Sequence, residues 1–170
     1  MVSNEYEKTA FTQKGTEIDL WLSDCGNGHR FDYDIFLSVD GDVADSIGHV
    51  DCTFYLTKEL PDGTYDTEFE WNANDDTNYL DDAISICAAD SGRSVAFHET
   101  SAMSYDCVAS DGSVYHLGGT IAASPCYFDG NVRGRRVSFS HDMEDAFDSF
   151  NGVARYYAIW AMDELNKAGV

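Results

Sequence analysis

Cysteine and histidine residues recur at two places where their spacing would suit a zinc ion. Cys25 and His29 flank a short turn, and His49 precedes Cys52 by three positions. Thiolate and imidazole are the usual ligands of structural zinc, commonly in such closely spaced pairs. However, His49 and Cys52 point to opposite faces if both lie on one β-strand, because successive side chains of a strand alternate. The sequence therefore favours no metal and no other cofactor.

Three histidines have neighbours that an enzyme could use. His98 and His141 are each followed by an acidic residue, and His116 lies in a strand-like segment. They could serve as general bases or metal ligands in a hydrolase. No G-x-S-x-G nucleophile motif accompanies them, and Gly118-Gly119 lacks the lysine of a phosphate-binding loop. We therefore expect a protein that is not an enzyme, with a metal-dependent or histidine-based hydrolase as the alternative.

The strongest feature of the sequence is its negative charge. The 170 residues include 31 Asp and Glu against 10 Lys and Arg, a net charge of −21. Residues 17–90 hold 19 of the acids and only two basic residues, whereas residues 91–141 are balanced. Such a chain repels phosphates, which argues against direct binding to nucleic acid or to an anionic membrane. A salt-adapted housekeeping protein is a further alternative, although salt adaptation should acidify the whole surface.

Acidic and apolar residues alternate in the first half of the chain, which is typical of half-buried antiparallel strands. The alternation predicts a meander of four strands over Glu17–Ser23, Arg30–Asp40, His49–Lys58 and Thr64–Trp71. One face of that sheet would carry both carboxylates and aromatic rings. Its predicted members are Glu17, Asp19, Asp32, Asp34, Asp51, Asp66, Glu68 and Glu70, with the rings of Trp21, Phe36 and Tyr55.

Two stretches have the apolar spacing of an amphipathic helix instead. These are Asp76–Asp90 and Ser140–Lys167, the second with Ser140 as its N-cap and Gly169 beyond its end. Between them the pattern predicts shorter strands at Val95–His98, Tyr105–Val108, Ser113–Leu117 and Val132–Phe139. Helices packed on an antiparallel sheet give an α+β fold. No linker or repeat marks a boundary, so we expect a single domain over residues 1–170.

The cysteines indicate the compartment. They are widely spaced, with no C-x-x-C pair, at Cys25, Cys52, Cys87, Cys107 and Cys126. An odd number of such cysteines, with no basic start of a signal peptide, favours free and mostly buried thiols in a reducing cytosol. No apolar run reaches the roughly 20 residues that span a bilayer. We therefore expect a cytoplasmic protein, in the host cytoplasm if a phage encodes it.

A dense row of carboxylates predicts a function in binding. On neighbouring strands they approach the charge density of a nucleic-acid backbone, and aromatic rings beside them can stack on arginine. We therefore expect an inhibitor that occupies the basic cleft of a nucleic-acid-binding protein or defence nuclease complex. The acids expected to contribute most are Asp66, Glu68 and Glu70, followed by Asp32, Asp34 and Asp51.

In composition and size the chain is similar to the small acidic anti-restriction and anti-CRISPR inhibitors of phages and mobile elements. That resemblance implies a nucleic-acid mimic, and no motif accompanies it. The Ala-rich C-terminal stretch could pair with a second copy, which leaves a homodimer open. We expect Arg133, Arg135 and Arg136 to pair with carboxylates of the protein itself or across a dimer interface.

Overall fold

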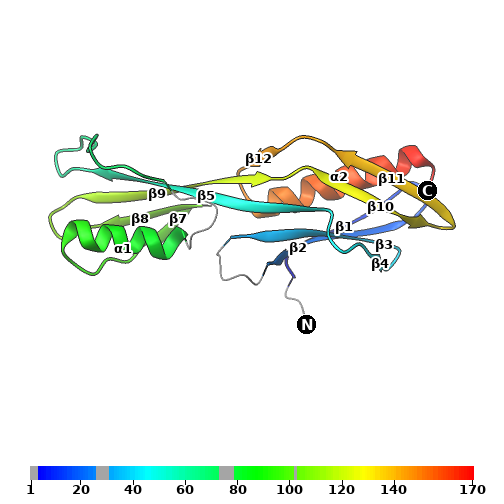
Figure 1. Ribbon diagram of the computed structural model, residues 1–170, viewed down its shortest axis with the longest axis horizontal. Helices are drawn as coiled ribbons and strands as arrows, with labels where there is room; N and C mark the ends of the chain where they lie inside the picture. Colours follow the sequence, from blue (N-terminus) through cyan, green and yellow to red (C-terminus); the bar gives the residue numbers. More distant parts are fainter. Residues whose placement is uncertain (1–3, 26–30, 73–78, 102) are drawn as a thin grey trace. The chain divides into compact units, whose positions relative to one another are not determined.

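The computed structural model describes residues 4–25, 31–72, 79–101 and 103–170 (Figure 1). It consists of antiparallel β-strands and two helices, so the predicted α+β class is confirmed. The chain divides into two compact units: a first unit of residues 1–26, 31–51 and 121–170, and a second unit of residues 27–30 and 52–120. Strands β5 (Gly48–Glu59) and β9 (Val114–Ala123) each contribute to both units. The single domain over residues 1–170 stays a prediction.

The first unit begins with the predicted meander, extended by one strand. Strands β1 (Asn4–Phe11), β2 (Glu17–Asp24) and β3 (Tyr33–Val39) pair antiparallel in this order, and the start of β5 pairs with β3. A short strand β4 (Asp42–Val43) pairs with the end of β3. The predicted strands β2, β3 and β5 are confirmed with bounds shifted by a few residues, whereas β1 was not predicted.

Helix α2 (Phe150–Ala168) packs against β1 and β2 of this sheet. It begins where the Ser149 side chain accepts a hydrogen bond from the Gly152 amide, and it ends at Gly169 in the left-handed conformation that glycine tolerates. The predicted end at Gly169 is therefore confirmed. The predicted start at Ser140 is wrong, because residues 140–147 belong to two strands and their connection.

The first unit also contains a β-hairpin that contacts α2. Its strands are β10 (Cys126–Val132) and β11 (Arg135–His141), and α2 contacts β11 (Figure 1). Arg133 and Gly134 between them both have positive φ, 50° and 83°, which reverses the chain. The strand predicted over Val132–Phe139 forms as β11 with a start three residues later, because Val132 ends β10 and the turn follows it. After the hairpin, β12 (Asp145–Phe147) pairs with the end of β9.

The second unit is built from the remaining halves of β5 and β9. Strand β9 pairs with β8 (Ser104–Val108), and β8 pairs with β7 (His98–Ser101). Helix α1 (Tyr79–Ser91) confirms the predicted mid-chain helix, and it ends before Gly92, which has a positive φ of 69°. The predicted start of this helix at Asp76 lies outside the described residues. The predicted strand Val95–His98 is wrong except for His98, which begins β7.

The fourth strand of the predicted meander does not form. Within Thr64–Trp71, only Tyr65 makes an isolated bridge, to Glu59, before the chain turns. The Asp66 carboxylate accepts a hydrogen bond from the Glu68 amide at 3.0 Å, and this local bond competes with strand pairing. Regular pairing resumes only in the two-residue strand β6 (Trp71–Asn72), which lies against β5.

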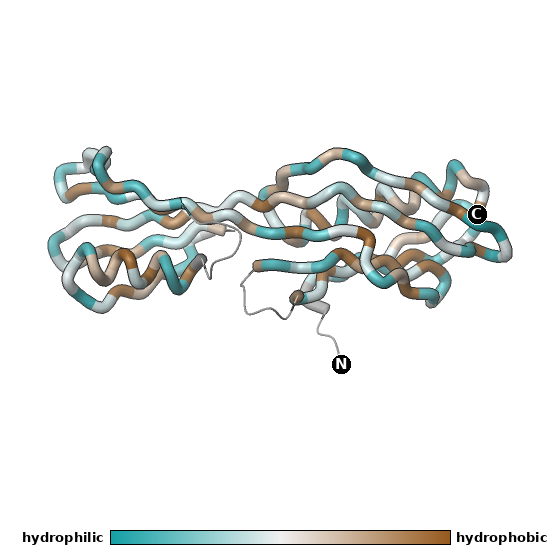
Figure 2. Tube along the Cα trace, viewed as in Figure 1, coloured by the Kyte–Doolittle hydropathy of each residue, from teal (hydrophilic) through white to brown (hydrophobic). Residues whose placement is uncertain are grey.

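The core follows the alternation of the strands, which Figure 2 shows as hydrophilic and hydrophobic segments in turn. In the first unit the inward side chains of β2 and β3 are fully buried: Ile18, Leu20, Leu22, Ile35 and Leu37. All five cysteines are free, and four are buried, as expected from the sequence. Within the described residues, neither helix has the length and apolarity that crossing a membrane requires.

Candidate functional site

The outer side of the first unit's sheet carries acids and stacked rings. Tyr33 on the inner side of β3 contacts Phe150 of α2, with ring centroids 5.0 Å apart, so the alternate side chains face away from that helix. These outward side chains of β2, β3 and the start of β5 form what we call the acidic face. Its members are Glu17, Asp19, Trp21, Asp34, Phe36, His49 and Asp51.

Strand register fixes the spacing of the acidic face. Trp21 lies opposite Phe36, and the two rings stack with centroids 5.7 Å apart and planes 11° apart. Asp34 lies opposite His49 on the next strand. Residues two apart on a strand are separated by about 6.7 Å, and adjacent strands by about 4.8 Å. β2, β3 and residues 48–51 contain no lysine or arginine, so the face has a dense negative charge.

The negative charge is shared between the units rather than confined to one of them. The first unit has 18 acidic and 7 basic residues, a net charge of −11, and the second has 13 and 3, a net charge of −10. The balanced stretch 91–141 forms no neutral body of its own, because it divides between the units after residue 120. Salt adaptation therefore stays an alternative that needs a direct test.

The arginines near the hairpin turn are satisfied inside the first unit. Arg133 donates to Asp40 at 3.0 Å, and Arg136 contacts both oxygens of Asp129 at 3.0 and 2.6 Å. Arg135 donates to a carbonyl at the C-terminal end of α2. Bonds from the Glu17 amide and from Arg133 lower the pKa of Asp40. The predicted pairing with the protein's own carboxylates is confirmed for Arg133 and Arg136, which neutralise acids outside the acidic face, whereas Arg135 donates to a backbone carbonyl.

The structure divides the ten predicted site residues into three groups. Five lie together on the acidic face: Glu17, Asp19, Trp21, Asp34 and Asp51. Four belong to the second unit: Tyr55, Asp66, Glu68 and Glu70. Asp32 was expected on the exposed face, but it is only 9% exposed and its carboxylate contacts His49, so that placement is wrong. Since Thr64–Trp71 is not a strand, no strand register places Asp66, Glu68 and Glu70 beside the acidic face.

In the second unit, one histidine lies between two carboxylates. His116 Nδ1 is 2.8 Å from Asp106, and its Nε2 is 2.9 Å from Glu59. Burial lowers the pKa of His116, but the hydrogen bonds with Glu59 and Asp106 outweigh burial, and the pKa is raised. Both ring nitrogens donate at once only in the protonated imidazole, so this geometry favours a charged, structural histidine over a general base.

The raised pKa of His116 predicts a pH-dependent contribution to stability. A raised pKa stabilises the fold fully below the ordinary histidine pKa of about 6.5, and the contribution is lost as the pH rises through the raised value. We therefore expect His116→Gln to destabilise the protein at pH 5.5–6 and to have little effect well above the raised pKa. Urea denaturation of the wild type and of His116→Gln across this pH range measures the difference in the free energy of unfolding. A loss of stability that is equal at every pH would contradict the assignment.

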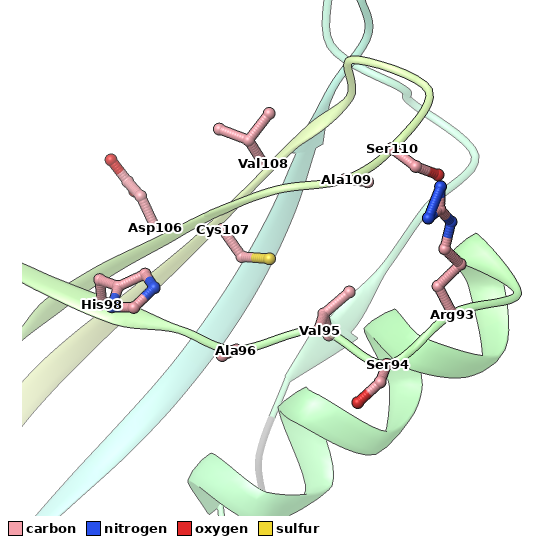
Figure 3. Close-up of a pocket in the computed structure, with 10 residues that line it drawn as sticks. All are labelled: Arg93, Ser94, Val95, Ala96, His98, Asp106, Cys107, Val108, Ala109 and Ser110. Carbon is pink, nitrogen blue, oxygen red and sulfur yellow. The ribbon is translucent and has the colours of Figure 1, made fainter.

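A cavity within the second unit is lined by both Cys107 and His98. It has a volume of about 520 Å³, and Figure 3 shows Arg93 and His98 at its two ends, with Val95 and Cys107 between them. In the described part of the chain the Cys107 thiol makes no hydrogen bond with His98, so the two do not form the nucleophile–base pair that acyl transfer needs. His141 belongs to the first unit, where it lies 3.2 Å from Asp145.

Comparison with known proteins gave no match, either to a protein-family model, to a curated protein or to a solved structure. The geometry itself therefore defines the class. This is an acidic α+β protein with a sheet surface on which carboxylates flank two stacked rings.

Proposed function

We propose that this protein acts by binding, and that the acidic face of its first unit docks into the basic, nucleic-acid-binding cleft of another protein. The observation that carries the proposal is a set of four carboxylates, two on either side of the stacked rings, on three paired strands without lysine or arginine. Glu17 and Asp19 lie two positions apart on one strand, about 6.7 Å, so arginines and lysines of a cleft could pair with them as with backbone phosphates. A docked protein would exclude the nucleic acid.

The stacked rings support the same proposal. Trp21 and Phe36 are both partly exposed in the middle of the acidic face. Aromatic rings attract the guanidinium groups that line such clefts, and they provide contact area with little loss of side-chain entropy. Like charges packed on one face also destabilise a fold, so a compensating role in binding explains their retention.

The partner class follows from this chemistry. A cleft that binds DNA or RNA through phosphates has many lysines and arginines, as in restriction enzymes and CRISPR effector nucleases. The protein would act there as a nucleic-acid mimic of the anti-restriction or anti-CRISPR type. Asp66, Glu68 and Glu70 of the second unit would supply an additional contact.

DNA competition tests this function directly. Labelled DNA is bound to each of a panel of purified restriction and CRISPR nucleases, and the protein is titrated into each complex while anisotropy reports the DNA. We expect displacement from at least one member, with an apparent affinity that falls steeply between about 50 and 200 mM salt. Displacement from none of them, or displacement that is insensitive to salt, would contradict the proposal.

Salt adaptation is the second candidate, because both units have nearly the same negative charge. A thermal melt distinguishes it. Screening length falls from about 30 Å at 0.01 M salt to about 8 Å at 0.15 M. If the acids serve binding, the protein should be folded at the lower concentration and its Tm should rise by only a few degrees at the higher one. Unfolding in low salt would instead favour a salt-adapted protein.

A further inference from the structure

Three donor atoms of different chemistry meet at one end of the acidic face. Cys25 directly follows β2, Asp34 lies in β3, and His49 lies in β5. The register places Asp34 between Ser23 and His49, which brings the three side chains together. One ligand atom from each lies within 4.8 Å of the other two.

The separations of these atoms match a tetrahedral zinc site. Zinc binds sulfur at about 2.3 Å and nitrogen or oxygen at about 2.0–2.2 Å, so tetrahedral ligands lie about 3.6 Å (S to N) and about 3.4 Å (N to O) apart. Cys25 Sγ lies 3.8 Å from His49 Nδ1, and Nδ1 lies 3.4 Å from Asp34 Oδ1. An ion placed among them would thus require only small movements of the side chains.

A fourth residue holds the histidine in the orientation that a ligand needs. Asp32 is 9% exposed, and its Oδ1 lies 2.5 Å from His49 Nε2. The backbone carbonyl of Asp32 also accepts a hydrogen bond from the Cys25 amide at 3.2 Å. A carboxylate on one ring nitrogen keeps the proton there and leaves the lone pair of the other nitrogen for a metal, as is usual for metal-binding histidines. Asp32 therefore positions both Cys25 and His49.

The charges of the group suit a divalent cation. The carboxylate of Asp34 lies beside the Cys25 thiol and His49. A thiol that coordinates a divalent cation loses its proton. A thiolate and one carboxylate then balance the charge of a divalent ion. The mixture of S, N and O donors favours zinc over magnesium or calcium, which prefer oxygen alone.

We propose that Cys25, Asp34 and His49 bind one zinc ion, with Asp32 as the positioning residue behind His49. Three protein ligands leave a fourth tetrahedral position for water or for a group of a binding partner. Of the four residues whose spacing in the sequence would suit zinc, two belong to this proposed site: Cys25 and His49. Cys52 is fully buried, and His29 lies outside the described residues. The proposal does not depend on the proposed inhibitory function.

The test uses the full chain without any partner. The protein is stripped with a chelator, reloaded with zinc and dialysed, and its metal content is measured; a second sample is loaded with Co²⁺ for absorption spectroscopy. We expect one ion per chain and a thiolate-to-cobalt charge-transfer band in the wild type. Cys25→Ser should lose the band, and His49→Gln should lose the ion. The matched control His116→Gln changes a histidine that also lies between two carboxylates, and it should retain both.

Asp32→Asn separates positioning from ligation. It should keep the cobalt band, because the three ligands are unchanged, and weaken zinc affinity about 10- to 100-fold in a chelator competition. Circular dichroism melts of the stripped variants confirm that each is folded. The proposal would be overturned by a wild type that retains no stoichiometric zinc, by a cobalt complex without the thiolate band, or by zinc binding that Cys25→Ser and His49→Gln leave intact.

Discussion

Changing three carboxylates of the acidic face to lysine should nearly abolish binding to the nuclease from which the protein displaces DNA. The variant combines Glu17→Lys, Asp19→Lys and Asp51→Lys, all on the outer side of the first unit's sheet. Single close charge pairs across an interface contribute from about 1.5 kcal/mol upward, so three reversals should weaken binding by at least about 100-fold. The substituted side chains point out of the core, so we expect the fold to be retained. The DNA-competition assay measures the loss.

A matched variant controls for net charge. Asp142→Lys, Glu144→Lys and Asp163→Lys change three exposed acids of the same unit that lie outside the acidic face, and the net charge changes equally. This control should bind the nuclease with an affinity within about threefold of the wild type. Charges at the edge of an interface act mainly on the association rate, so their effect on affinity is small. Equal losses in both variants would show that total charge, rather than the acidic face, governs binding. Changing Asp66, Glu68 and Glu70 to lysine in the same assay shows whether the second unit contributes to binding.

Replacing Tyr157 by alanine should be among the most destabilising single changes in the first unit. Tyr157 of α2 is fully buried, and its ring lies 5.1 to 5.9 Å from four neighbouring rings: His141, Phe147, Tyr156 and Trp160. Its hydroxyl donates to Asp145 at 3.3 Å. Truncating a buried aromatic residue costs about 3–5 kcal/mol, a large part of the 5–15 kcal/mol that stabilises a typical protein. Urea denaturation monitored by circular dichroism measures the change.

Two further variants show where that energy comes from. Tyr156→Ala removes the adjacent ring, which is 43% exposed, and should cost clearly less than Tyr157→Ala. Tyr157→Phe keeps the ring and loses only the hydroxyl, so we expect about 1 kcal/mol. If Tyr157→Ala cost no more than Tyr156→Ala, the ring cluster would not be part of the core as described.

The sequence predicted the parts of the fold in which local pattern and burial agree. In β2 and β5, apolar and polar side chains alternate along most of the strand, and one face of each is buried. In α1, apolar residues at helical spacing include Ala83 and Cys87, both fully buried. In these elements each residue's environment follows from its immediate neighbours, so the class of fold could be inferred without tertiary information.

The predictions from sequence fail where a local interaction or strand pairing overrides the pattern of apolar residues. Thr64–Trp71 alternates like a strand, yet the hydrogen bond between the Asp66 carboxylate and the Glu68 amide favours a turn. Residues 140–147 continue the apolar spacing of α2, but they pair as β11 and β12 instead. The local signal for the true helix start was present, since Ser149 precedes Phe150 and can cap its first turn.

The candidate sites show the same division. The acidic face of the first unit could be predicted because alternation assigns side chains to faces. The group of proposed zinc ligands could not be predicted. It depends on the register that sets Asp34 opposite His49 and on the hydrogen bond from the Cys25 amide to the Asp32 carbonyl. Asp32 and Asp34 are two residues apart and were therefore assigned to one exposed row, whereas Asp32 precedes β3 and is buried.

Carboxyl footprinting of the complex tests the central claim most directly. The protein is labelled with a carbodiimide and an amine, alone and bound to the nuclease it displaces from DNA, and mass spectrometry reports the modification of each acid. We predict strong protection of Glu17, Asp19 and Asp51 in the complex, with Asp142, Glu144 and Asp163 labelled as in the free protein. Unchanged labelling of the first three acids in a saturated complex would contradict the claim that the partner binds the acidic face.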